Sequence, residues 1–565
     1  MGKTSKQYLD IIYLQLEEFD WEGVAQTCRE LIEEIFTSEI SFEMDEFFAV
    51  MKLLRRKRRF AIMVRLGDAL SVTSRTNFSI RNLYAQSLIE QGFFTSAISV
   101  LEKLEADILA SEAGGSTFAY SENQGILGRA YKQLYVRTGY SRTDRAVAFL
   151  SKGIAYYLRI YKSDPGQRTW HGVNAVALLA LARRSSIDLS SLGNENDLAS
   201  EILACIEQKR MEDTADAWDY ATAAECCLAL NDFTEALRWL AGYSSHSGCD
   251  AFELASTLRQ FEQVWQLNLD SQSGQLLLPI LRAELLRRSG GQFDIDPEDI
   301  RKELAVAGTV DTQYKEMVEP GNEQRLEKVF GADSFRTYKW YMQGARRCLA
   351  VARIGTDSTR GAGTGFLVRG FDLHASFGDE LLLLTNSHVI SNDPLEKAIS
   401  PMEAVVIFEV LDSQMEFKLK EIVWFSPSTD LDCALLRFDA DDLQKLKDLT
   451  AEVDWYQLSP ALPVGENQKV YIIGHPQGGT LQLSFQDNQL LDAEDPKIHY
   501  RTPTDHGSSG SPIFTRTWHL LGLHHAGSAE MKCLNNKDGT YAANEGIWIN
   551  AIIKAIGADL DPIAN

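Results

Sequence analysis

Residues 505–514 of the chain read "DHGSSGSPIF", a run of serines and small residues that ends where a hydrophobic segment begins. Serine, glycine and proline in such a run ordinarily make a surface turn. A serine in the run can also be a nucleophile, provided that a base lies within hydrogen-bond reach and a third group fixes that base. The rest of the chain must then supply a histidine and an acid in matching contexts.

The part of the chain that contains this run has the periodicity of an all-β fold. From about residue 349 onward the hydrophobic residues fall into many short runs with period 2, which is typical of β-barrels. The clearest runs are "TGFLV", "LLLLTNSHVI", "EAVVIFEV", "EIVWFS", "CALLRF", "KVYIIGHP", "SPIFT" and "LLGLHHAG". Residues 548–560 have a helical pattern, so we predict an all-β domain that ends in a helix.

Two of these runs carry the partners that a catalytic serine needs. His388 ends a hydrophobic strand, and Asp432 directly precedes "CALLRF", where a carboxylate is drawn toward the interior and can hold an imidazole. In "GSSGSP" the amides of Gly507 and Ser509 can bind an oxyanion. Taken singly, the histidine fits a structural role, the aspartate a turn and the serine a loop. Together, in the chain order His, Asp, Ser, they favour a catalytic group.

These segments resemble a trypsin-like (chymotrypsin-fold) serine peptidase. The resemblance covers residues 349–565 and rests on "GTGFLV", "TNSHVI", "DCALL", "GSSGSP" and the returning strand "GLHHAG". It implies a double six-stranded β-barrel with the site between the barrels. It also implies that His388 is the general base, that Asp432 orients it and that Ser509 is the nucleophile. Asp430 is the competing acid, and we expect no metal or cofactor.

The sequence departs from the common family pattern in three places. Ser387 stands where many relatives have alanine, and Ser511 where the digestive branch has glycine, so "GSSGSP" is closer to the bacterial glutamyl endopeptidases. An Ile-Val-Gly-Gly activation terminus is also lacking, because the domain is entered from an upstream helix. We therefore expect control by a route other than a freed N-terminal amine.

The residues before the nucleophile and on the returning strand bear on substrate preference. Pro503 stands where the trypsin branch has the aspartate that recognises basic residues. Thr504 and His524 match the positions that bind an acidic side chain in glutamyl endopeptidases, which suggests cleavage after Glu or Asp. The alternative is that His524 packs against the barrel and the pocket takes a small or apolar residue. By the same resemblance, backbone groups of His525 and Gly527 pair with the substrate.

The first half of the chain has helical periodicity instead. Three segments, 19–31, 88–101 and 228–240, share a turn, an aromatic residue that opens a helix and a small residue three positions later. The aromatic and small residues are Trp21 and Val24, Phe94 and Ala97, and Phe233 and Ala236. This pattern predicts helix-turn-helix repeats of tetratricopeptide (TPR) type over residues 1–119, as part of an irregular α-solenoid.

Residues 120–287 resemble the TRAF-binding helical domain of apoptosis-signalling MAP kinase kinase kinases. The core of this resemblance is Trp170, Gly172, Val173, Asn174 and Ala175. Residues 288–348 are charged and punctuated by glycine and proline, which predicts a linker and a connecting helix.

Composition limits the classes of partner. The formal net charge of −23, from 79 acidic and 56 basic residues, argues against non-specific binding to nucleic acid or to an anionic membrane. The start "MGKTSKQYLD" has no secretory pattern and no segment is apolar enough to span a bilayer. The eight cysteines have no metal-ligand spacing, which favours a reduced, cytoplasmic protein.

These observations give one main functional hypothesis and one alternative. The main hypothesis is an intracellular serine endopeptidase that cleaves protein substrates, with a helical half that senses a signal, recruits substrate or binds a regulatory protein. A bacterial defence or signalling pathway is one setting, and binding or cleavage near residues 288–345 is the expected release of the site. The alternative is a non-catalytic scaffold in which the barrel is a degenerate peptidase fold.

Overall fold

The computed structural model describes most of residues 4–561 and divides the chain into two compact units. The helical unit is Met1–Gly290 with Tyr314–Phe335, and the barrel unit is Gly291–Gln313 with Arg336–Asn565. The described residues leave gaps at 18–20, 38–42, 74–76, 112–116, 247, 288–295, 317–331, 359–360, 394–396, 451–454, 456, 464–467, 485–488 and 502–506.

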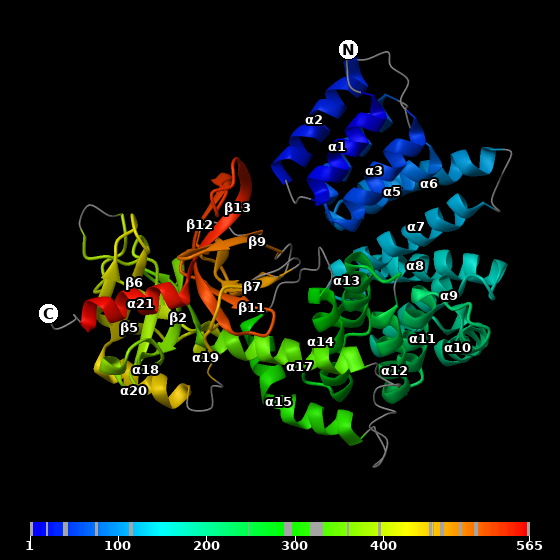
Figure 1. The fold of residues 1–565 in the computed structure, drawn as a ribbon. Coiled ribbons are helices and arrows are strands. Elements are labelled where there is room, and N and C mark those ends of the chain that lie inside the picture. Colours follow the sequence, from blue (N-terminus) through cyan, green and yellow to red (C-terminus); the bar gives the residue numbers. More distant parts are fainter. Residues whose placement is uncertain are drawn as a thin grey trace. The chain divides into compact units, whose positions relative to one another are not determined.

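The helical unit is a succession of helices that pack against their neighbours in the chain, as the blue to green ribbon of Figure 1 shows. Its α-helices are α1 (Ser5–Glu17), α2 (Trp21–Thr37), α3 (Met44–Arg56), α4 (Phe60–Val72), α5 (Phe78–Glu90), α6 (Phe94–Ala110), α7 (Phe118–Arg137), α8 (Asp144–Ser163), α9 (Thr169–Arg184), α10 (Glu195–Met211), α11 (Ala217–Ala229), α12 (Phe233–Ser245), α13 (Ala251–Arg259) and α14 (Gln272–Arg287). The predicted all-α solenoid is thereby confirmed.

The repeat pattern sets where three of these helices begin. Helices α2, α6 and α12 start at the three aromatic residues of the sequence pattern. Gly92 and Asn231, in the turns before α6 and α12, have φ of 79° and 60°, a left-handed conformation that glycine and asparagine adopt most readily. Ala97 and Ala236 are fully buried, which is consistent with close approach of neighbouring helices at these small side chains.

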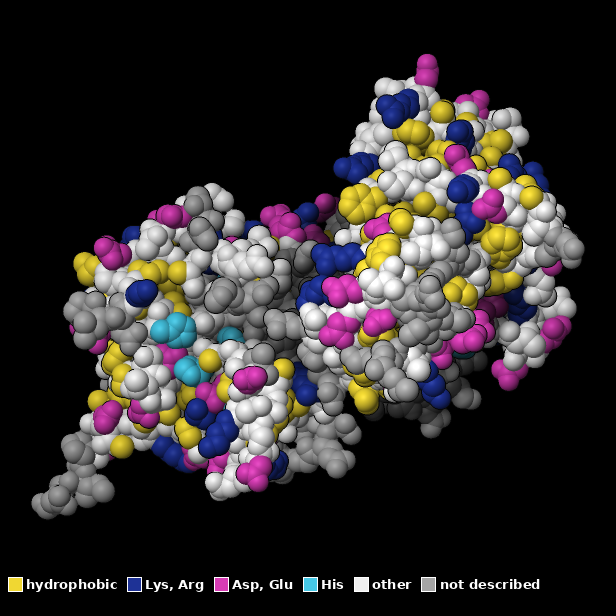
Figure 2. Space-filling model, turned by 90° about the horizontal axis from the view of Figure 1, so that it is seen from above, with side chains coloured by type: hydrophobic (Ala, Val, Ile, Leu, Met, Phe, Trp, Pro, Cys, Tyr) yellow, Lys and Arg dark blue, Asp and Glu magenta, His cyan; other side chains and the backbone are white. Residues whose placement is uncertain are grey.

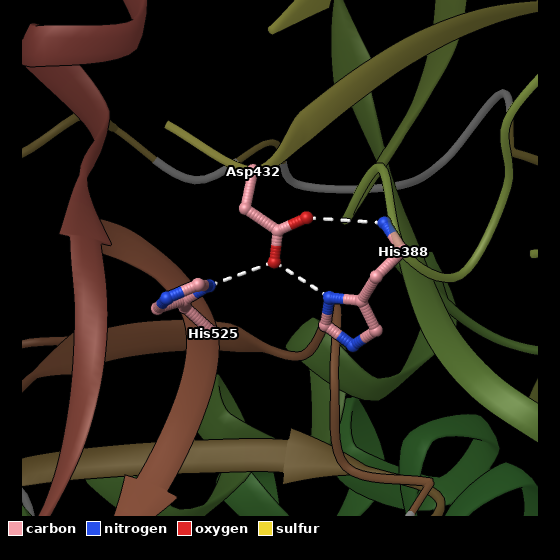
Figure 3. Close-up of side chains that lie close together, drawn as sticks. All are labelled: His388, Asp432 and His525. Atoms are coloured by element: carbon pink, nitrogen blue, oxygen red, sulfur yellow. Dashed lines mark hydrogen bonds and ion pairs between the residues drawn. The ribbon is translucent and has the colours of Figure 1, made fainter. Parts of the chain in front are cut away.

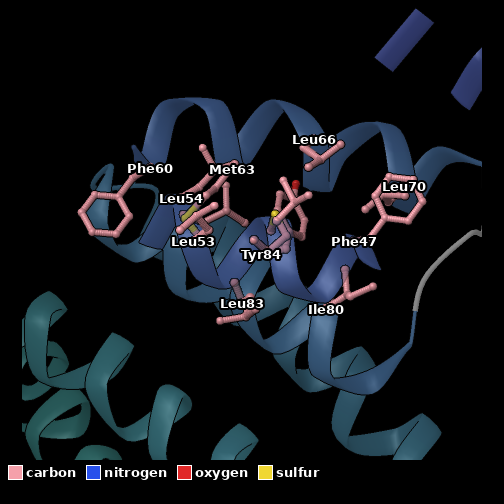
Figure 4. Packing of buried hydrophobic residues seen from close by; sticks show 14 of the residues in the cluster. Phe47, Leu53, Leu54, Phe60, Met63, Leu66, Leu70, Ile80, Leu83 and Tyr84 are labelled. Carbon is pink, nitrogen blue, oxygen red and sulfur yellow. The ribbon is translucent and has the colours of Figure 1, made fainter. Parts of the chain in front are cut away.

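Apolar side chains on α3, α4 and α5 form much of one continuous core in this unit (Figure 4). Phe47, Leu54, Met63, Leu70 and Ile80 are all at most 2% exposed. Burial of one such side chain contributes about 1.5–3 kcal/mol. The apolar stripes that the sequence shows are thus used for packing between helices.

The segment predicted as a linker contains two helices, α15 (Pro297–Glu316) and α17 (Ala332–Arg347). In the barrel unit, Trp340 of α17 donates from Nε1 to the Arg516 carbonyl at 2.8 Å and accepts at its own carbonyl from Trp518 Nε1 at 2.8 Å. The Tyr341 hydroxyl donates to the buried Glu303 carboxylate of α15 at 2.6 Å. The described end of the predicted connecting helix therefore packs on the barrels.

The barrel unit contains two antiparallel sheets. Strands β1 (Val351–Gly355), β2 (Gly361–Arg369), β3 (Leu381–Thr385), β4 (Val405–Ile407), β5 (Phe417–Ser426) and β6 (Cys433–Phe438) form a closed barrel in the order β1-β2-β3-β6-β5-β4. Strands β7 (Val470–Gly474), β8 (Gln482–Ser484), β9 (Gln489–Glu494), β10 (Lys497–Arg501), β11 (Pro512–Thr515), β12 (Leu520–Lys532) and β13 (Thr540–Trp548) form a sheet in the order β8-β7-β11-β12-β13-β10-β9.

The second sheet differs in detail from the six-stranded barrel that the resemblance implies. It has seven strands, and among the described residues an isolated bridge between Lys469, before β7, and Gln489 links the end strand β9 to the start of β7. The short strand β8 pairs only with β7 among the described residues. The sequence pattern did not distinguish a closed six-stranded barrel from this seven-stranded sheet.

The predicted C-terminal helix is present as α21 (Ile549–Leu560), shown in red in Figure 1. It packs against β12 and β13 of the second sheet. Near its end, Asp559 accepts a hydrogen bond from Trp424 Nε1 of β5 at 2.9 Å. This helix therefore contacts both sheets and links them to each other.

The surface and the helices bear on the expected partner classes. On the face shown in Figure 2, acidic and basic side chains are interspersed. In the described parts of the chain, the helices are all too short or too polar to cross a bilayer. The eight cysteines are free thiols. Cytoplasmic localisation and the lack of nucleic-acid partners stay predictions.

We predict that Gly344→Ala destabilises the barrel unit by about 1–3 kcal/mol, because a Cβ at Gly344 would overlap the buried ring of Trp518. Gly557 of α21 is the matched control, since a Cβ there meets no atom within 4 Å and alanine favours a helix by about 1 kcal/mol. Hydrogen exchange in β11 and β12 during denaturant unfolding measures both effects. Equal stability of the two variants would contradict the proposed packing of α17.

Candidate active site

Asp432 lies at the end of the turn that leads into β6 and is completely buried. Its amide donates to the Pro427 carbonyl at 3.0 Å, and its φ of 47° places it in the left-handed region. That conformation is uncommon outside glycine, asparagine and aspartate. The turn thus directs the Asp432 carboxylate toward the interior, as its place before the hydrophobic strand predicted.

Four hydrogen bonds reach the Asp432 carboxylate, and Figure 3 shows those from His388 and His525. Oδ1 accepts from the Ser387 hydroxyl at 2.6 Å and from the His388 amide at 3.0 Å. Oδ2 accepts from His388 Nδ1 at 2.6 Å and from His525 Nδ1 at 2.7 Å. Burial by itself raises the pKa of Asp432, but these hydrogen bonds and the nearby His388 lower it well below its usual range. The carboxylate is therefore ionised at neutral pH.

His388 follows β3 in a short turn that Asp432 also holds. The Asn386 side chain donates to the Asp432 carbonyl at 2.8 Å, so the backbones of both segments are tied together. The His388 side chain is 37% exposed, which leaves its outer edge open to a substrate. The competing acid, Asp430, is exposed and accepts from Ser426 Oγ at 3.2 Å. The structure brings Asp432, not Asp430, to the imidazole.

Ser509 lies in a tight loop that the first barrel holds in place. Thr364 of β2 donates from its amide to the Ser509 carbonyl at 2.8 Å and from its hydroxyl to the Gly507 carbonyl at 2.9 Å. Gly507 and Gly510 have φ of 94° and 86°. A Cβ at Gly510 would overlap the Thr364 carbonyl, so both the backbone conformation and the close approach require glycine there.

Among the described residues, the Ser509 hydroxyl and the His388 ring are not hydrogen-bonded to each other. Catalytic hydrogen bonds are often long before substrate binds and shorten in the complex. Beside the loop, a cavity of about 630 Å³ opens next to Gly507. Its lining residues are Thr356, Asp357, Gly361, Ala362, Ile399, Gln477, Gly478 and Gly507. Gly507, one of the two predicted oxyanion donors, thus lines this hollow.

His524, the predicted contact for an acidic substrate side chain, is buried on β12. Its Nδ1 is 2.6 Å from the hydroxyl of Tyr500 on β10. Burial, together with the nearby His525 and His388, lowers the pKa of His524 to about 3, so the ring is neutral. Burial raises the pKa of Tyr500 well above its usual value. Thr504, the second predicted contact, lies outside the described residues.

Beyond His524, one edge of β12 has no strand partner among the residues that the structure describes. The His524 amide donates to the Ser511 carbonyl at 2.8 Å, and its carbonyl accepts from Gly510 at 3.0 Å. On the other edge Gly527 pairs with Asn544 of β13. His524 is therefore hydrogen-bonded to the loop that carries Ser509, and His525 and Gly527 follow it on the strand where pairing with a substrate strand was predicted.

His388, Asp432 and His525 offer three potential metal-ligand atoms within 4.8 Å of one another. Each Nδ1 is at hydrogen-bond distance from a single carboxylate oxygen, however, which is shorter than the spacing of ligands around a tetrahedral zinc ion. Hydrogen bonding accounts for this group without a metal.

Sequence reasoning missed several residues that shape the site. Thr364 lies in the quoted "GTGFLV" segment, but its two contacts join the loop to a strand more than 140 residues earlier. Ser387 was noted only as a departure, although its hydroxyl holds Asp432. The side chain of His525 was not considered, and its position after His524 in "LHHAG" was the available signal.

Comparisons with known protein families find one match in each half of the chain. Residues 363–523 match the model of the trypsin-like peptidase domain, and residues 59–179 match that of the Tetratricopeptide Repeats-Sensor family. The uncharacterized protein y4fB of Sinorhizobium fredii is 26% identical over 235 residues, which cover 38% of this chain and 33% of that protein. The chain thus matches about a third of that relative's length.

The solved structures that the chain is similar to include three peptidases. A Glu endopeptidase in complex with MPD is 17% identical and is covered to 90%, with 37% of this chain and a TM-score of 0.27. An inactive mutant of Rv3671c from M. tuberculosis is 15% identical and covered to 92%, with 40% of this chain and a TM-score of 0.25. A serine endoprotease from Yersinia pestis is 16% identical and covered to 67%, with 40% of this chain and a TM-score of 0.26.

The family match spans most of both sheets, including the segments that carry His388, Asp432 and Ser509. The N-terminal match covers helices from α4 to α9, and the TRAF-binding resemblance stays a prediction. The C-terminal half of the chain is therefore similar to a trypsin-like peptidase domain over residues 363–523, and the helical half is similar to a tetratricopeptide repeat region over residues 59–179.

Proposed function

We propose that the site described above is the catalytic centre, with His388 as general base, Asp432 as the residue that orients it and Ser509 as nucleophile. The observation that carries this proposal is the fully buried Asp432 carboxylate, which holds both the amide and the Nδ1 of His388. A charge with no exposure is costly unless it is fully hydrogen-bonded. The buried carboxylate orients a partly exposed imidazole, and the outer nitrogen of that ring can act as the base in acyl transfer.

The hydrogen bond from Nδ1 determines what His388 can do. An ionised carboxylate only accepts, so the proton of the neutral imidazole lies on Nδ1 and the lone pair on Nε2. Nε2 takes the proton of Ser509 as the hydroxyl attacks a peptide carbonyl, and Asp432 stabilises the imidazolium that forms. The amides of Gly507 and Ser509 bind the oxyanion, where one donor is worth about 10²–10³ in kcat.

We predict that Ser509→Ala abolishes labelling by a fluorophosphonate probe and that Asp432→Asn lowers kcat by about 10⁴-fold, because the wrong tautomer of His388 is then held. Asp430→Asn is the matched control, since the Asp430 side chain is exposed, accepts from Ser426 and is not hydrogen-bonded to His388 among the described residues. It should retain activity within about twofold. Labelling of a Ser509→Ala protein, or an inactive wild type, would favour the non-catalytic scaffold instead.

We further propose that an acidic substrate side chain binds at His524. Tyr500 keeps its proton because burial raises its pKa, and its hydroxyl can therefore donate to His524 Nδ1. The neutral ring then carries its proton on Nε2, which makes that edge a hydrogen-bond donor. A carboxylate is the stronger of the possible acceptors, and its entry raises the proton affinity of the ring.

We predict that His524→Ala lowers kcat/KM for peptides with Glu before the scissile bond by about 10- to 100-fold, with little change for the matching Ala peptides. Tyr500→Phe should reduce the same preference less. It removes the hydroxyl that keeps the proton of His524 on Nε2, but it leaves the imidazole in place. The preference for Glu should strengthen from pH 8 to pH 5, as the ring binds a proton together with the substrate carboxylate. A peptide-library digest of wild type without acidic preference would end this proposal.

The helical region is proposed to control the peptidase through α17. The match to a sensor family and the helical repeats favour a region that binds a protein or another signal. Helix α17 packs on Trp518, in the turn between β11 and β12, and these strands flank the nucleophile loop and carry His524. A change at α17 thus has a short physical route to the site. A defence or signalling pathway stays a prediction.

We predict that cleavage at an engineered protease site within residues 317–331 raises the basal peptidase rate by about 5- to 150-fold, the range of typical allosteric coupling. Because Tyr341 still holds Glu303 after the cut, combination with Tyr341→Phe should increase the effect. A site introduced at residues 112–116 is the control, since that cut leaves the two units covalently joined. Equal rates before and after both cuts would show that the helical region does not restrain the peptidase.

A further inference from the structure

A second imidazole contacts the buried carboxylate of the site, as Figure 3 shows. His525 Nδ1 lies 2.7 Å from Asp432 Oδ2, the same oxygen that His388 Nδ1 reaches at 2.6 Å. The His525 side chain is 20% exposed, so it belongs to the inside of the site more than to its surface. Two histidines thus share one acceptor atom.

A bulge in β12 explains why the two adjacent histidines reach different partners. In the pairing with β13, His524 is opposite Gly546 and Ala526 is opposite Glu545, so that His525 is the extra residue. A bulge redirects the side chain of the extra residue and is frequent beside active sites. The ring of His524 consequently meets Tyr500 in the second sheet, and that of His525 meets Asp432 next to β6 of the first barrel.

The other nitrogen of His525 faces a second carboxylate. Nε2 is 3.5 Å from Oε1 of Glu545, which is only 5% exposed. Glu545 also accepts from Lys497 Nζ at 3.0 Å and from His499 Nε2 at 2.9 Å, both on β10. Burial raises the pKa of Glu545, but the His499 and Lys497 hydrogen bonds and the nearby charges of Lys497 and His525 outweigh it, so the pKa is lowered.

The positions of the donors and acceptors decide the protonation of His525. Both carboxylates only accept, so a neutral His525 that donates from Nδ1 to Asp432 would direct its Nε2 lone pair at Glu545. A doubly protonated ring presents an N–H to each carboxylate. The charged and titratable groups around it are Asp432 and His388 from the first barrel, His524 beside it, Glu545 on β13, and Lys497 and His499 behind Glu545.

We propose that His525 is a positioning residue of the triad, held as an imidazolium between Asp432 and Glu545; this rests on the proposed catalytic role of His388. Its Nδ1–H fixes the Asp432 carboxylate against His388. Its positive charge opposes protonation of His388, so that His388 remains available as a base at lower pH than it would beside Asp432 alone.

Two substitutions separate the hydrogen bond from the charge. His525→Asn keeps an N–H donor near the position of Nδ1 and carries no charge, so the acid limb of the pH profile of kcat/KM should move up by about one pH unit. His525→Ala leaves an Asp432 lone pair without a donor, which should lower kcat by about 10- to 100-fold with little effect on KM. Glu545→Gln should move the acid limb in the same direction as His525→Asn, but less.

The test that does not depend on activity is histidine-selective ¹⁵N NMR on the full chain carrying Ser509→Ala. The His525 ring should show two N–H protons at pH 7, and His525→Asn should move the His388 ring titration to higher pH. His374→Asn is the matched control, because His374 contacts Asp561 and does not touch Asp432. It should leave the His388 titration unchanged.

The outcomes distinguish the two proposals. A neutral His525 ring at pH 7, or a His388 titration that does not respond to His525→Asn, would overturn the role of His525, whatever the activity. The expected spectra together with an inactive wild type would instead retain the electrostatic role and reject the proposed peptidase function. If His525→Ala does not fold, the asparagine variant and the spectra still decide.

Discussion

The burial of one negative charge, on Asp432, is the constraint on which the site depends. A carboxylate without solvent is stable only if donors replace water around it, and here the donors come from segments far apart in the chain. Ser387 and His388 follow a strand of the first barrel, and His525 lies on a strand of the second sheet. The two sheets therefore cannot separate or slide at this point without leaving a buried charge unpaired.

The loop that carries Ser509 is also held by hydrogen bonds from a distant segment of the chain. Thr364, on β2 of the first barrel, donates from its amide and its hydroxyl to two carbonyls of this loop. The same hydroxyl also accepts from the His475 amide at 3.0 Å. Directional hydrogen bonds fix the separation and orientation of two sheets more narrowly than apolar contacts do, because they weaken steeply with angle. Polar contacts at this seam thus set the geometry, and the apolar cores within each sheet provide stability.

Much of the fold could be predicted from sequence because it depends on local patterns. Helix starts at Trp21, Phe94 and Phe233 follow from turn chemistry and aromatic placement, and the strands of the barrel unit follow from period-2 runs. The choice of Asp432 over Asp430 also had a local signal, the hydrophobic run that follows. What was not predictable depends on distant contacts. The packing of α17 follows from long-range contacts, and the bridge from Lys469 to Gln489 and the bulge at His525 follow from strand register, which periodicity does not encode.

The bulge at His525 has a consequence for how the buried charges coexist. Going outward from the site, the groups are His388, Asp432, His525, Glu545 and then Lys497 with His499, so acids alternate with bases. Each acid thus has a cationic or hydrogen-donating neighbour on both sides, and the chain of contacts ends near the surface at Lys497. Such a network stabilises the fold only when it is complete, because removal of one member leaves its neighbours buried and unpaired. Because His525 stands at the bulge, the contacts of the Asp432 carboxylate extend to Glu545 of β13 and, through Glu545, to Lys497 and His499 of β10. The second sheet therefore takes part in the electrostatics around His388, in addition to carrying the loop of Ser509.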